Sequence, residues 1–373
     1  MGHMAGLYFH IPFCKNICAY CDFFRTGDLR RMDDTLQAMA SELRRGRDFL
    51  SDHTIRTIYF GGGTPSLVRP DVLQRLIDEA RGLYDCGGVE EITVEANPDD
   101  VTEEYVAALR RTDINRVSLG VQSFDDAELR FMRRRHTAAE AVAAVRRLQD
   151  AGYGNITVDL IFGVEGFGGE ALTRSLERTV GLGVQHVSAY HLTIEPGTLF
   201  GRRLADGRMH EVDETVSEAE YAAVERALTA AGFEHYEVSN YAREGFRARH
   251  NSSYWHGAQY LGIGPGAHSF NGEVRRWSRQ RPEDYIVRPR YESERLSPQD
   301  HYNEYVMTGL RCVEGIDCGH VRQQFGKARF ESMMREAAKW IASGELRYAN
   351  DRLSIPTERM LVSDAVIERL FET

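Results

Sequence analysis

Apolar and polar positions alternate in two rhythms along the first 195 residues. Short runs rich in β-branched and aromatic residues predict strands at 7–11, 57–60, 92–96, 116–121, 156–162 and 186–192. Between these runs Ala and Leu recur at helical spacing, which predicts helices at 33–50, 70–83, 102–111, 138–151 and 170–182. Six β-then-α units predict an α/β fold, a parallel sheet with helices outside it that is either open or curled into a barrel.

The regular alternation of predicted strands and helices ends after residue 192, and the remaining chain is expected to contain a domain boundary. We expect residues 5–274 to form the first domain, residues 275–299 a charged and Pro-containing connector, and residues 300–373 a separate, mostly helical C-terminal domain. Residues 1–4, Met1-Gly2-His3-Met4, resemble an expression scar followed by the natural start.

Composition narrows the class of protein. Of the 373 residues 42% are hydrophobic and 27% charged, and no stretch approaches the ~20 apolar residues that span a bilayer. The formal net charge of −10 argues against a nucleic-acid partner. No apolar signal segment follows the N-terminus, so a cytoplasmic protein is expected.

Six cysteines are present, and three of them form a C-x3-C-x2-C motif directly after the first predicted strand. These are Cys14, Cys18 and Cys21, whereas the other three are isolated. Zinc would need a fourth ligand, which His10 could supply. A [4Fe-4S] cluster with one iron left open suits three thiolates better.

A glycine-rich motif, Gly61-Gly62-Gly63-Thr64-Pro65-Ser66, follows the second predicted strand. Glycines let the backbone approach a ligand closely and expose its N–H and C=O groups. In parallel α/β folds the carboxyl ends of the strands gather on one side, where ligands bind. The motif can therefore hold the amino group of an amino-acid-like cofactor on the open iron.

Together these motifs resemble the radical S-adenosylmethionine (SAM) superfamily and, within it, the coproporphyrinogen-oxidase-like group. The resemblance rests on blocks spread over nearly the whole chain: 8–21, 61–66, 95–98, 120–124 and 159–163. It implies a partial (β/α)6 barrel with a C-terminal helical domain. It also implies that the open iron binds SAM, which one-electron reduction cleaves to methionine and a 5′-deoxyadenosyl radical.

Carried over position by position, the resemblance makes the three clustered cysteines the ligands of the [4Fe-4S] cluster. The positions that it places around SAM are Tyr8, Tyr20, Gly62, Gly63, Thr64, Glu95, Gln122, Arg134 and Asp159. Without the family, Glu95 and Asp159 would be ordinary capping or turn acids, and the run Arg133 to Arg135 a solvated helix face. One departure is Val164-Glu165, where the group usually has a Leu-Pro or similar pair.

Two functions occur in this group. Oxygen-independent coproporphyrinogen III dehydrogenases carry a fourth cysteine two residues after the third, and this chain has Phe23 there. Haem chaperones carry an H-N-x-x-Y-W motif, which this chain has from His250 to Trp255. An axial His and aromatic walls suit haem. The resemblance therefore favours a haem chaperone with His250 as haem ligand, and His268 in the shared Gly262–Ser269 segment is a second candidate.

The partners implied are haem and the apo-proteins that receive it. The resemblance leaves open a homodimer and peripheral contact with membrane haem proteins. It assigns no catalytic residue to this chain.

Overall fold

The computed structural model describes residues 5–372, and its main feature is a sheet of twelve strands. Seven neighbouring strands of this sheet are parallel. In sheet order they are β9 (Gln259–Ile263), β1 (Ala5–Ile11), β2 (Ile55–Gly62), β3 (Glu91–Ala96), β4 (Arg116–Gln122), β5 (Ile156–Phe162) and β6 (His186–His191). The six predicted strands are confirmed to within a few residues.

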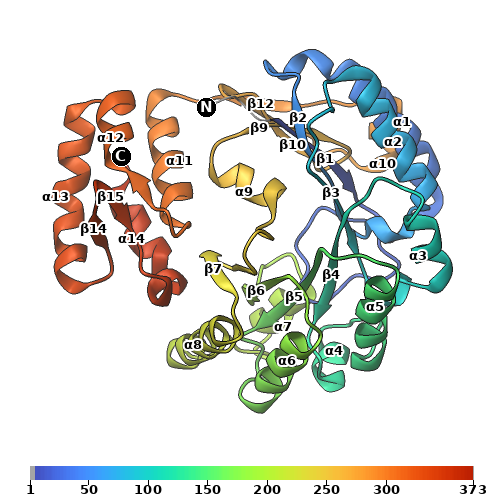
Figure 1. Cartoon of the computed structure of the whole chain (residues 1–373), viewed down its shortest axis with the longest axis horizontal. Helices are drawn as coiled ribbons and strands as arrows, with labels where there is room; N and C mark the ends of the chain where they lie inside the picture. The colour runs from blue at the N-terminus through green and yellow to red at the C-terminus, as the bar shows by residue number, and fades with distance from the viewer. Residues whose placement is uncertain (1–4, 373) are drawn as a thin grey trace.

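Helices cover the outer face of the curved sheet, as Figure 1 shows. They are α1 (Met32–Arg45), α2 (Pro70–Leu83), α3 (Glu103–Leu109), α4 (Asp126–Phe131), α5 (Ala138–Asp150), α6 (Glu170–Gly181) and α8 (Glu214–Ala230). The short helix α7 (Leu199–Ala205) packs instead against the loop after β1, where the N–H of Phe200 donates to the carbonyl oxygen of Ala19 at 2.9 Å. Short 3-10 turns lie at Leu29–Arg31, Arg47–Phe49, Pro65–Leu67, Pro98–Asp100 and Thr357–Val362. The expected partial (β/α)6 barrel is confirmed.

The side chains of β1 alternate between apolar and polar, which explains why the barrel has an apolar outer layer and a polar interior. Leu7, Phe9 and Ile11 are fully buried in the core that also contains residues of α1. Because successive side chains of a strand point to opposite faces, Tyr8 and His10 face the interior. Each strand in this way delivers polar or aromatic groups to the inside of the barrel.

Antiparallel strands extend the sheet at both edges. Beyond β9 lie β10 (His268–Phe270), β11 (Val274–Trp277) and β12 (Glu292–Arg295), and beyond β6 lie β8 (Asn240–Ala242) and β7 (Glu234–Glu237). The expected connector, 275–299, therefore contributes two strands to the main sheet, with α10 (Pro282–Val287) between them. Its strands carry mostly charged, partly or fully exposed residues, so hydrophobic periodicity did not reveal them.

The C-terminal part lies beside the open side of the barrel (Figure 1). It contains α11 (Pro298–Leu310), α12 (Cys318–His320) with a π-helical turn Val321–Phe325, α13 (Lys327–Ser343) and α14 (Ser363–Leu370). It also has a small sheet of β13 (Ile316–Asp317), β15 (Arg352–Ser354) and β14 (Arg347–Ala349). The short helix α9 (Arg249–Trp255) contacts both β2 and α11. Within residues 5–372, no helix combines the length and apolar character needed to cross a bilayer.

Candidate functional site

Three cysteines lie on the loop that follows β1. Cys14 is buried, Cys18 and Cys21 are half-buried, and none of them forms a disulfide. The loop is closed at its base, where the backbone N–H of Thr26 donates to the carbonyl oxygen of Pro12 at 2.7 Å. The three thiols are thereby held on one closed loop at the carboxyl end of the first strand.

Two of the thiols accept hydrogen bonds from other loops. The hydroxyl of Thr64 donates to Cys14 Sγ at 3.5 Å, and the guanidinium of Arg134 donates to Cys18 Sγ at 3.4 Å. Burial raises the pKa of Cys14 and raises that of Cys21 to about 11, so ionisation of these thiols needs a bound cation. Thiolates whose sulfurs accept hydrogen bonds are typical iron–sulfur ligands, and the donor set fits the predicted [4Fe-4S] cluster.

His10 is not free to be a fourth zinc ligand. Its Nε2 donates to the carbonyl oxygen of Phe24 at 2.8 Å, and its Nδ1 accepts from the hydroxyl of Tyr8 at 3.0 Å. Burial lowers the pKa of His10 to about 4, so the ring is neutral. In the part of the chain that the structure describes, no three His, Cys, Asp or Glu side chains converge on a single metal-ion position.

The glycine loop after β2 lies directly against the cysteine loop. A Cβ at Gly63 would come within 2.7 Å of the carbonyl carbon of Pro12. Gly62 has a φ of +110°, and its N–H donates to Glu95 Oε2 at 3.1 Å. The hydroxyl of Tyr59 donates to Glu95 Oε1 at 2.8 Å. Close approach of the two loops therefore requires glycine at these positions, and it places the β3 carboxylate beside them.

Two carboxylates face the barrel interior near this loop. Burial raises the pKa of Glu95 to about 7, and the charge of Asp159 adds to the rise. Burial also raises the pKa of Asp159, which accepts a hydrogen bond from the Ser118 hydroxyl at 3.2 Å. Both acids present oxygens that can accept from ribose hydroxyls or an amino group.

Gln122 and Arg134 lie together over the end of β4. Gln122 has a φ of +71°, at a point where the pairing of β4 with β5 shifts register. Arg134 donates to Asn97 Oδ1 at 2.7 Å and to the carbonyl oxygen of Gly120. Arg133 is exposed, whereas Arg134 is half-buried and turns inward, so the arginine run that follows α4 is not a uniformly solvated helix face.

The two predicted tyrosines come from the first strand and from the cysteine loop. Tyr8 of β1 stacks on Tyr59, with ring centroids 6.0 Å apart. Tyr20 is half-buried in the cysteine loop and packs against a second, smaller apolar core. Burial raises the pKa of both phenols well above 10, so both rings are neutral.

A buried aspartate that the sequence did not single out joins three of these loops. Asp100, at the end of the turn after β3, accepts from Lys15 of the cysteine loop at 2.8 Å and from Ser66 of the glycine loop at 3.0 Å. Arg135 donates to it at 3.2 Å. The backbone N–H of Asn97 donates to the same Ser66 hydroxyl at 3.2 Å. The polar segment directly after the third strand was the available signal for this hub.

The unusual pair after β5 has a defined place. Val164 is buried in the second core, and Glu165 is turned outward, where it pairs with His210 at 3.0 Å. The departure from the group's pattern therefore leaves an ordered loop.

His250 lies inside the barrel on α9 and is 1% exposed. Its Nδ1 is hydrogen-bonded to the Thr57 hydroxyl at 2.8 Å and its Nε2 to the Tyr254 hydroxyl at 2.7 Å. The ring stacks on Tyr59 at 5.0 Å. Burial, with the charge of Arg116 adding to it, lowers the pKa of His250 to about 3. In this conformation His250 is a satisfied, neutral interior residue.

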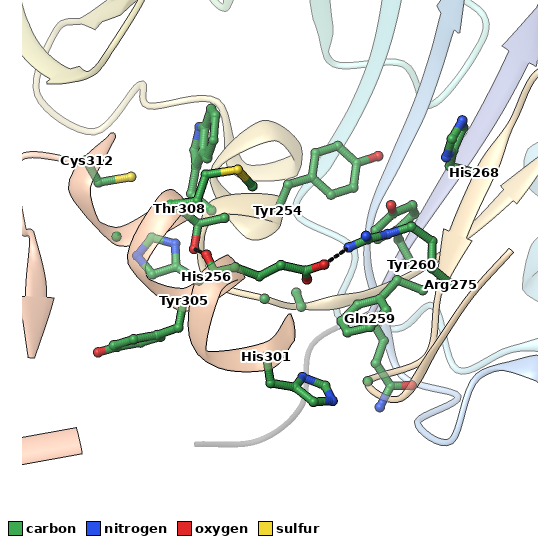
Figure 2. A pocket seen from close by; sticks show the side chains of 18 of the residues that line it. Tyr254, His256, Gln259, Tyr260, His268, Arg275, His301, Tyr305, Thr308 and Cys312 are labelled. Atoms are coloured by element: carbon green, nitrogen blue, oxygen red, sulfur yellow. Dashed lines mark hydrogen bonds and ion pairs between the residues drawn. The ribbon is translucent and has the colours of Figure 1, made fainter. Parts of the chain in front are cut away.

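A cavity of ≈ 1300 Å³ lies between the barrel mouth and the C-terminal part (Figure 2). Its barrel wall includes Tyr8, Phe23, Tyr254, Trp255, His256, His268 and Arg275, and its other wall His301, Tyr305, Thr308, Cys312 and His320. His250 is not on this wall, although its partner Tyr254 is. Arg275 reaches across to Glu304 of α11 in an ion pair of 2.8 Å (Figure 2). The cavity therefore joins the cysteine loop to α11.

Comparison with known families agrees with this arrangement. The family model "Radical SAM superfamily" matches residues 8–179, and "HemN C-terminal domain" matches residues 296–361. A protein named heme chaperone HemW from Mycobacterium tuberculosis is 36% identical, covering 99% of this chain and 95% of the relative. HemW of Bacillus subtilis is 31% identical, with 90% and 92% covered, and that of Escherichia coli 34% identical, with 83% of each covered.

Among solved structures, coproporphyrinogen III oxidase (HemN) from Escherichia coli, described as a radical SAM enzyme, matches with a TM-score of 0.83. The match covers 99% of this chain and 90% of that one, at 19% sequence identity. At that identity the likeness establishes the fold.

Proposed function

Since the chain belongs to the HemW family of the radical SAM superfamily, we propose that it is a haem chaperone, which binds haem together with a [4Fe-4S] cluster and SAM and delivers the haem to apo-proteins. The observation that carries the proposal is the ≈ 1300 Å³ cavity beside the cysteine loop. Haem needs aromatic or apolar walls and an axial ligand, commonly His. The wall of this cavity offers both.

The proposal assigns the cysteine loop to the cluster and the neighbouring loops to SAM. Cys14, Cys18 and Cys21 would hold three irons, which leaves the fourth iron for the amino and carboxylate groups of SAM. When bound, the cluster supplies an electron at this position. The residues proposed to bind SAM are Tyr8, Tyr20, Gly62, Gly63, Thr64, Glu95, Gln122, Arg134 and Asp159.

Each of these groups has a physical task that its contacts support. Glu95 and Asp159 can accept hydrogen bonds from ribose hydroxyls or the SAM amino group. Arg134 donates to Cys18 Sγ at 3.4 Å, which stabilises a thiolate there. The glycines give the cofactor access to backbone groups that side chains would cover.

The prediction that His250 binds haem stands beside this assignment. Because its Nε2 is hydrogen-bonded to the Tyr254 hydroxyl at 2.7 Å, iron could bind this nitrogen only after Tyr254 turned away. Substitution of His250 tests this prediction: haem binding should be lost if His250 is the iron ligand and retained if the ligand is a side chain of the cavity wall.

The alternative, a coproporphyrinogen III dehydrogenase, lacks support at one position. Where that enzyme has its fourth cysteine this chain has Phe23, which lines the cavity and is 70% exposed. An exposed phenyl ring suits contact with a flat macrocycle and has no thiol chemistry. The three sequence relatives named above also carry the name heme chaperone.

For partners and location we propose a cytoplasmic protein that passes haem to apo-proteins, in line with its bacterial relatives. The net charge of −10 disfavours a nucleic-acid partner. A homodimer and peripheral contact with membrane haem proteins are further proposals, for which gel filtration and vesicle flotation are direct tests.

The test uses anaerobically reconstituted protein in two arms. In the first arm haem is titrated in, and the complex is mixed with haem-free myoglobin; we expect saturable binding and transfer of haem to the globin. In the second arm SAM, a reductant and coproporphyrinogen III are added, and no decarboxylated product is expected. Product formed over several turnovers would establish the dehydrogenase instead, and failure to bind haem would refute the chaperone.

A further inference from the structure

Arg116 lies buried at the floor of the barrel, the end at which the parallel strands begin. It is the first residue of β4 and is 1% exposed. Its Nη2 donates to the hydroxyl of Thr157 on β5 at 2.5 Å, and its Nε lies 3.9 Å from Glu91 Oε2 on β3. Among residues 5–372, Nε and Nη1 have no hydrogen-bond acceptor. Burying a guanidinium with so few partners is costly, so a purely structural role explains it poorly.

The guanidinium reaches below the two carboxylates that we assign to SAM. Side chains two or four residues apart on a strand share a face of the sheet. Thr157 therefore lies on the same face of β5 as Asp159, and Glu91 likewise shares its face of β3 with the other acid, Glu95. Ser118 of β4 lies between these strands; it donates to Asp159 at 3.2 Å and is the register partner of Glu95. The guanidinium is thus a positive charge below both acids.

The charge of Arg116 acts on both acids. Burial raises the pKa of Glu95 to about 7; Asp159 adds to the rise, and Arg116 opposes it. Burial likewise raises the pKa of Asp159, and the charges of Arg116 and Arg134 oppose that rise. Because two neighbouring carboxylates repel each other, a nearby cation decides whether both can be ionised together.

The other titratable side chains that face these groups are neutral, apart from Arg134 and the ion-pair partner Glu91. Burial raises the pKa of each phenol in the barrel interior and lowers the pKa of each imidazole near Arg116. The phenols are Tyr8, Tyr59, Tyr190, Tyr236 and Tyr254, and the imidazoles are His186 and His250. Arg134 also donates to Cys18 Sγ, so its charge is shared with the cysteine loop.

From these observations we propose that Arg116 is a positioning residue for SAM: it keeps the Glu95 and Asp159 carboxylates ionised, so that their oxygens accept hydrogen bonds from the ribose hydroxyls and amino group of the cofactor. It acts from the floor of the barrel, whereas the cysteine and glycine loops lie at the opposite, carboxyl ends of the strands. The inference rests on the proposed assignment of these two acids to SAM.

The size of the effect follows from the strand geometry. Two residues along a strand span about 7 Å, the spacing of Thr157 and Asp159. A unit charge at that distance, in an interior with an effective dielectric constant of about 20, shifts a pKa by about 1–2 units. Loss of the Arg116 charge should therefore raise the pH at which the acids ionise by that amount.

The first experiment measures SAM affinity over a pH series by anaerobic calorimetry on the full-length, reconstituted protein. We expect the pH midpoint of binding to rise by about 1–2 units in Arg116→Gln. In Arg116→Lys, which keeps the charge, the midpoint should stay near that of the wild type. Thr157→Val is the matched control: it removes the acceptor of the guanidinium but keeps the cation, so its midpoint should not move.

Glu91→Gln distinguishes a charge effect from a structural one. It breaks the same ion pair as Arg116→Gln but removes a negative charge, so its midpoint should move down. Damage to the barrel floor would move both variants in the same direction. An unchanged midpoint in Arg116→Gln, or an upward shift in Glu91→Gln, would overturn the proposal. If Arg116→Gln alone does not fold, the same substitution in the Glu91→Gln background should raise the midpoint relative to that background.

A second readout needs no SAM. Full-length protein labelled with carbon-13 at the glutamate carboxyl carbons is titrated by NMR, and the Glu95 signal is the one missing from Glu95→Gln. Its midpoint should rise in Arg116→Gln by about 1–2 units as well. If the wild type binds no SAM, the assignment of the two acids to SAM fails, whereas this titration still tests the action of Arg116. Equal Glu95 midpoints in wild type and Arg116→Gln would refute that action even if SAM binds.

Discussion

Replacing Glu95 with glutamine should weaken SAM binding and remove a pH dependence near neutrality. The carboxylate accepts from the Tyr59 hydroxyl at 2.8 Å and from the Gly62 N–H at 3.1 Å. Burial raises its pKa to about 7; nearby Asp159 raises it further, and Arg116 opposes the rise. The neutral phenol of Tyr8 lies on the same side of Gly61 as this carboxylate. The group that we assign to SAM therefore changes charge close to physiological pH.

The magnitude follows from this pKa. A carboxyl group with a pKa of about 7 is about one-tenth ionised at pH 6 and about nine-tenths at pH 8. If SAM needs the ionised form, its affinity should rise about tenfold between these pH values, or ~1.4 kcal/mol. Glutamine removes a charge-assisted hydrogen bond of about 1.5–3 kcal/mol, so the variant should bind SAM about 10- to 150-fold more weakly at pH 8.

The assay is anaerobic calorimetry with SAM at pH 6, 7 and 8, on protein whose iron content and visible spectrum have been checked. Titration of SAM itself is common to all variants and cancels in the comparison. Tyr59→Phe is the matched control: it keeps the carboxylate but removes a hydrogen bond that stabilises its ionised form. The pH midpoint of that variant should therefore move upward. Wild-type affinity at pH 8 in Glu95→Gln, or an unchanged pH dependence, would refute the reasoning.

Three further predictions concern the cluster and the stability of the barrel. Cys18→Ser should abolish retention of reconstituted iron in a colorimetric iron assay, and Cys86→Ser should not; equal loss in both would contradict the three-ligand loop. Asp100→Asn should lower the free energy of unfolding by about 1.5–3 kcal/mol, because Asp100 is a buried acceptor of charge-assisted bonds, and should lower iron retention. In the same urea titrations, Lys15→Met, which removes only its half-exposed partner, should cost less than about 1 kcal/mol. Finally, because the folded pKa of Glu95 is raised, its stabilising effect is complete below pH 4.5 and is lost as pH rises to about 7. Glu95→Gln should thus gain up to about 3 kcal/mol on the wild type between pH 4.5 and 7, and parallel stability curves would contradict this.

Sequence periodicity was sufficient to predict the strands and helices of the barrel because each parallel strand has a continuous apolar outer face. Leu7, Phe9 and Ile11 show this for β1, and the helices that cover them repeat Ala and Leu at matching intervals. The strands β11 and β12 lack such a face, since their residues are half-exposed or exposed and largely charged. Their pairing comes from backbone hydrogen bonds and from polar cross-strand contacts, such as the one from Trp277 Nε1–H to Glu292 Oε2 at 3.1 Å, and neither leaves an apolar pattern in the sequence.

In the site, too, features within one segment could be predicted from the sequence, whereas contacts between distant segments could not. The cysteine and glycine motifs are contiguous, so spacing alone indicated their chemistry. The role of Asp100 depends on Lys15, 85 positions earlier, and the orientation of His250 depends on Thr57, 193 positions earlier. A motif identifies which residues are present at such a site, but tertiary contacts decide which atoms are left free for a ligand.

The position of β1 in the sheet determines when its two edges can pair during synthesis of the chain. β1 is first in the sequence, but its two neighbours in the sheet are β2 and β9. On the ribosome the N-terminal part of a chain emerges first, and β2 becomes available soon afterwards. The other edge of β1 stays open until β9 emerges about 250 residues later. The strand that leads into the three thiols is therefore synthesised before both of its partners and is among the last of the described strands to be fully paired.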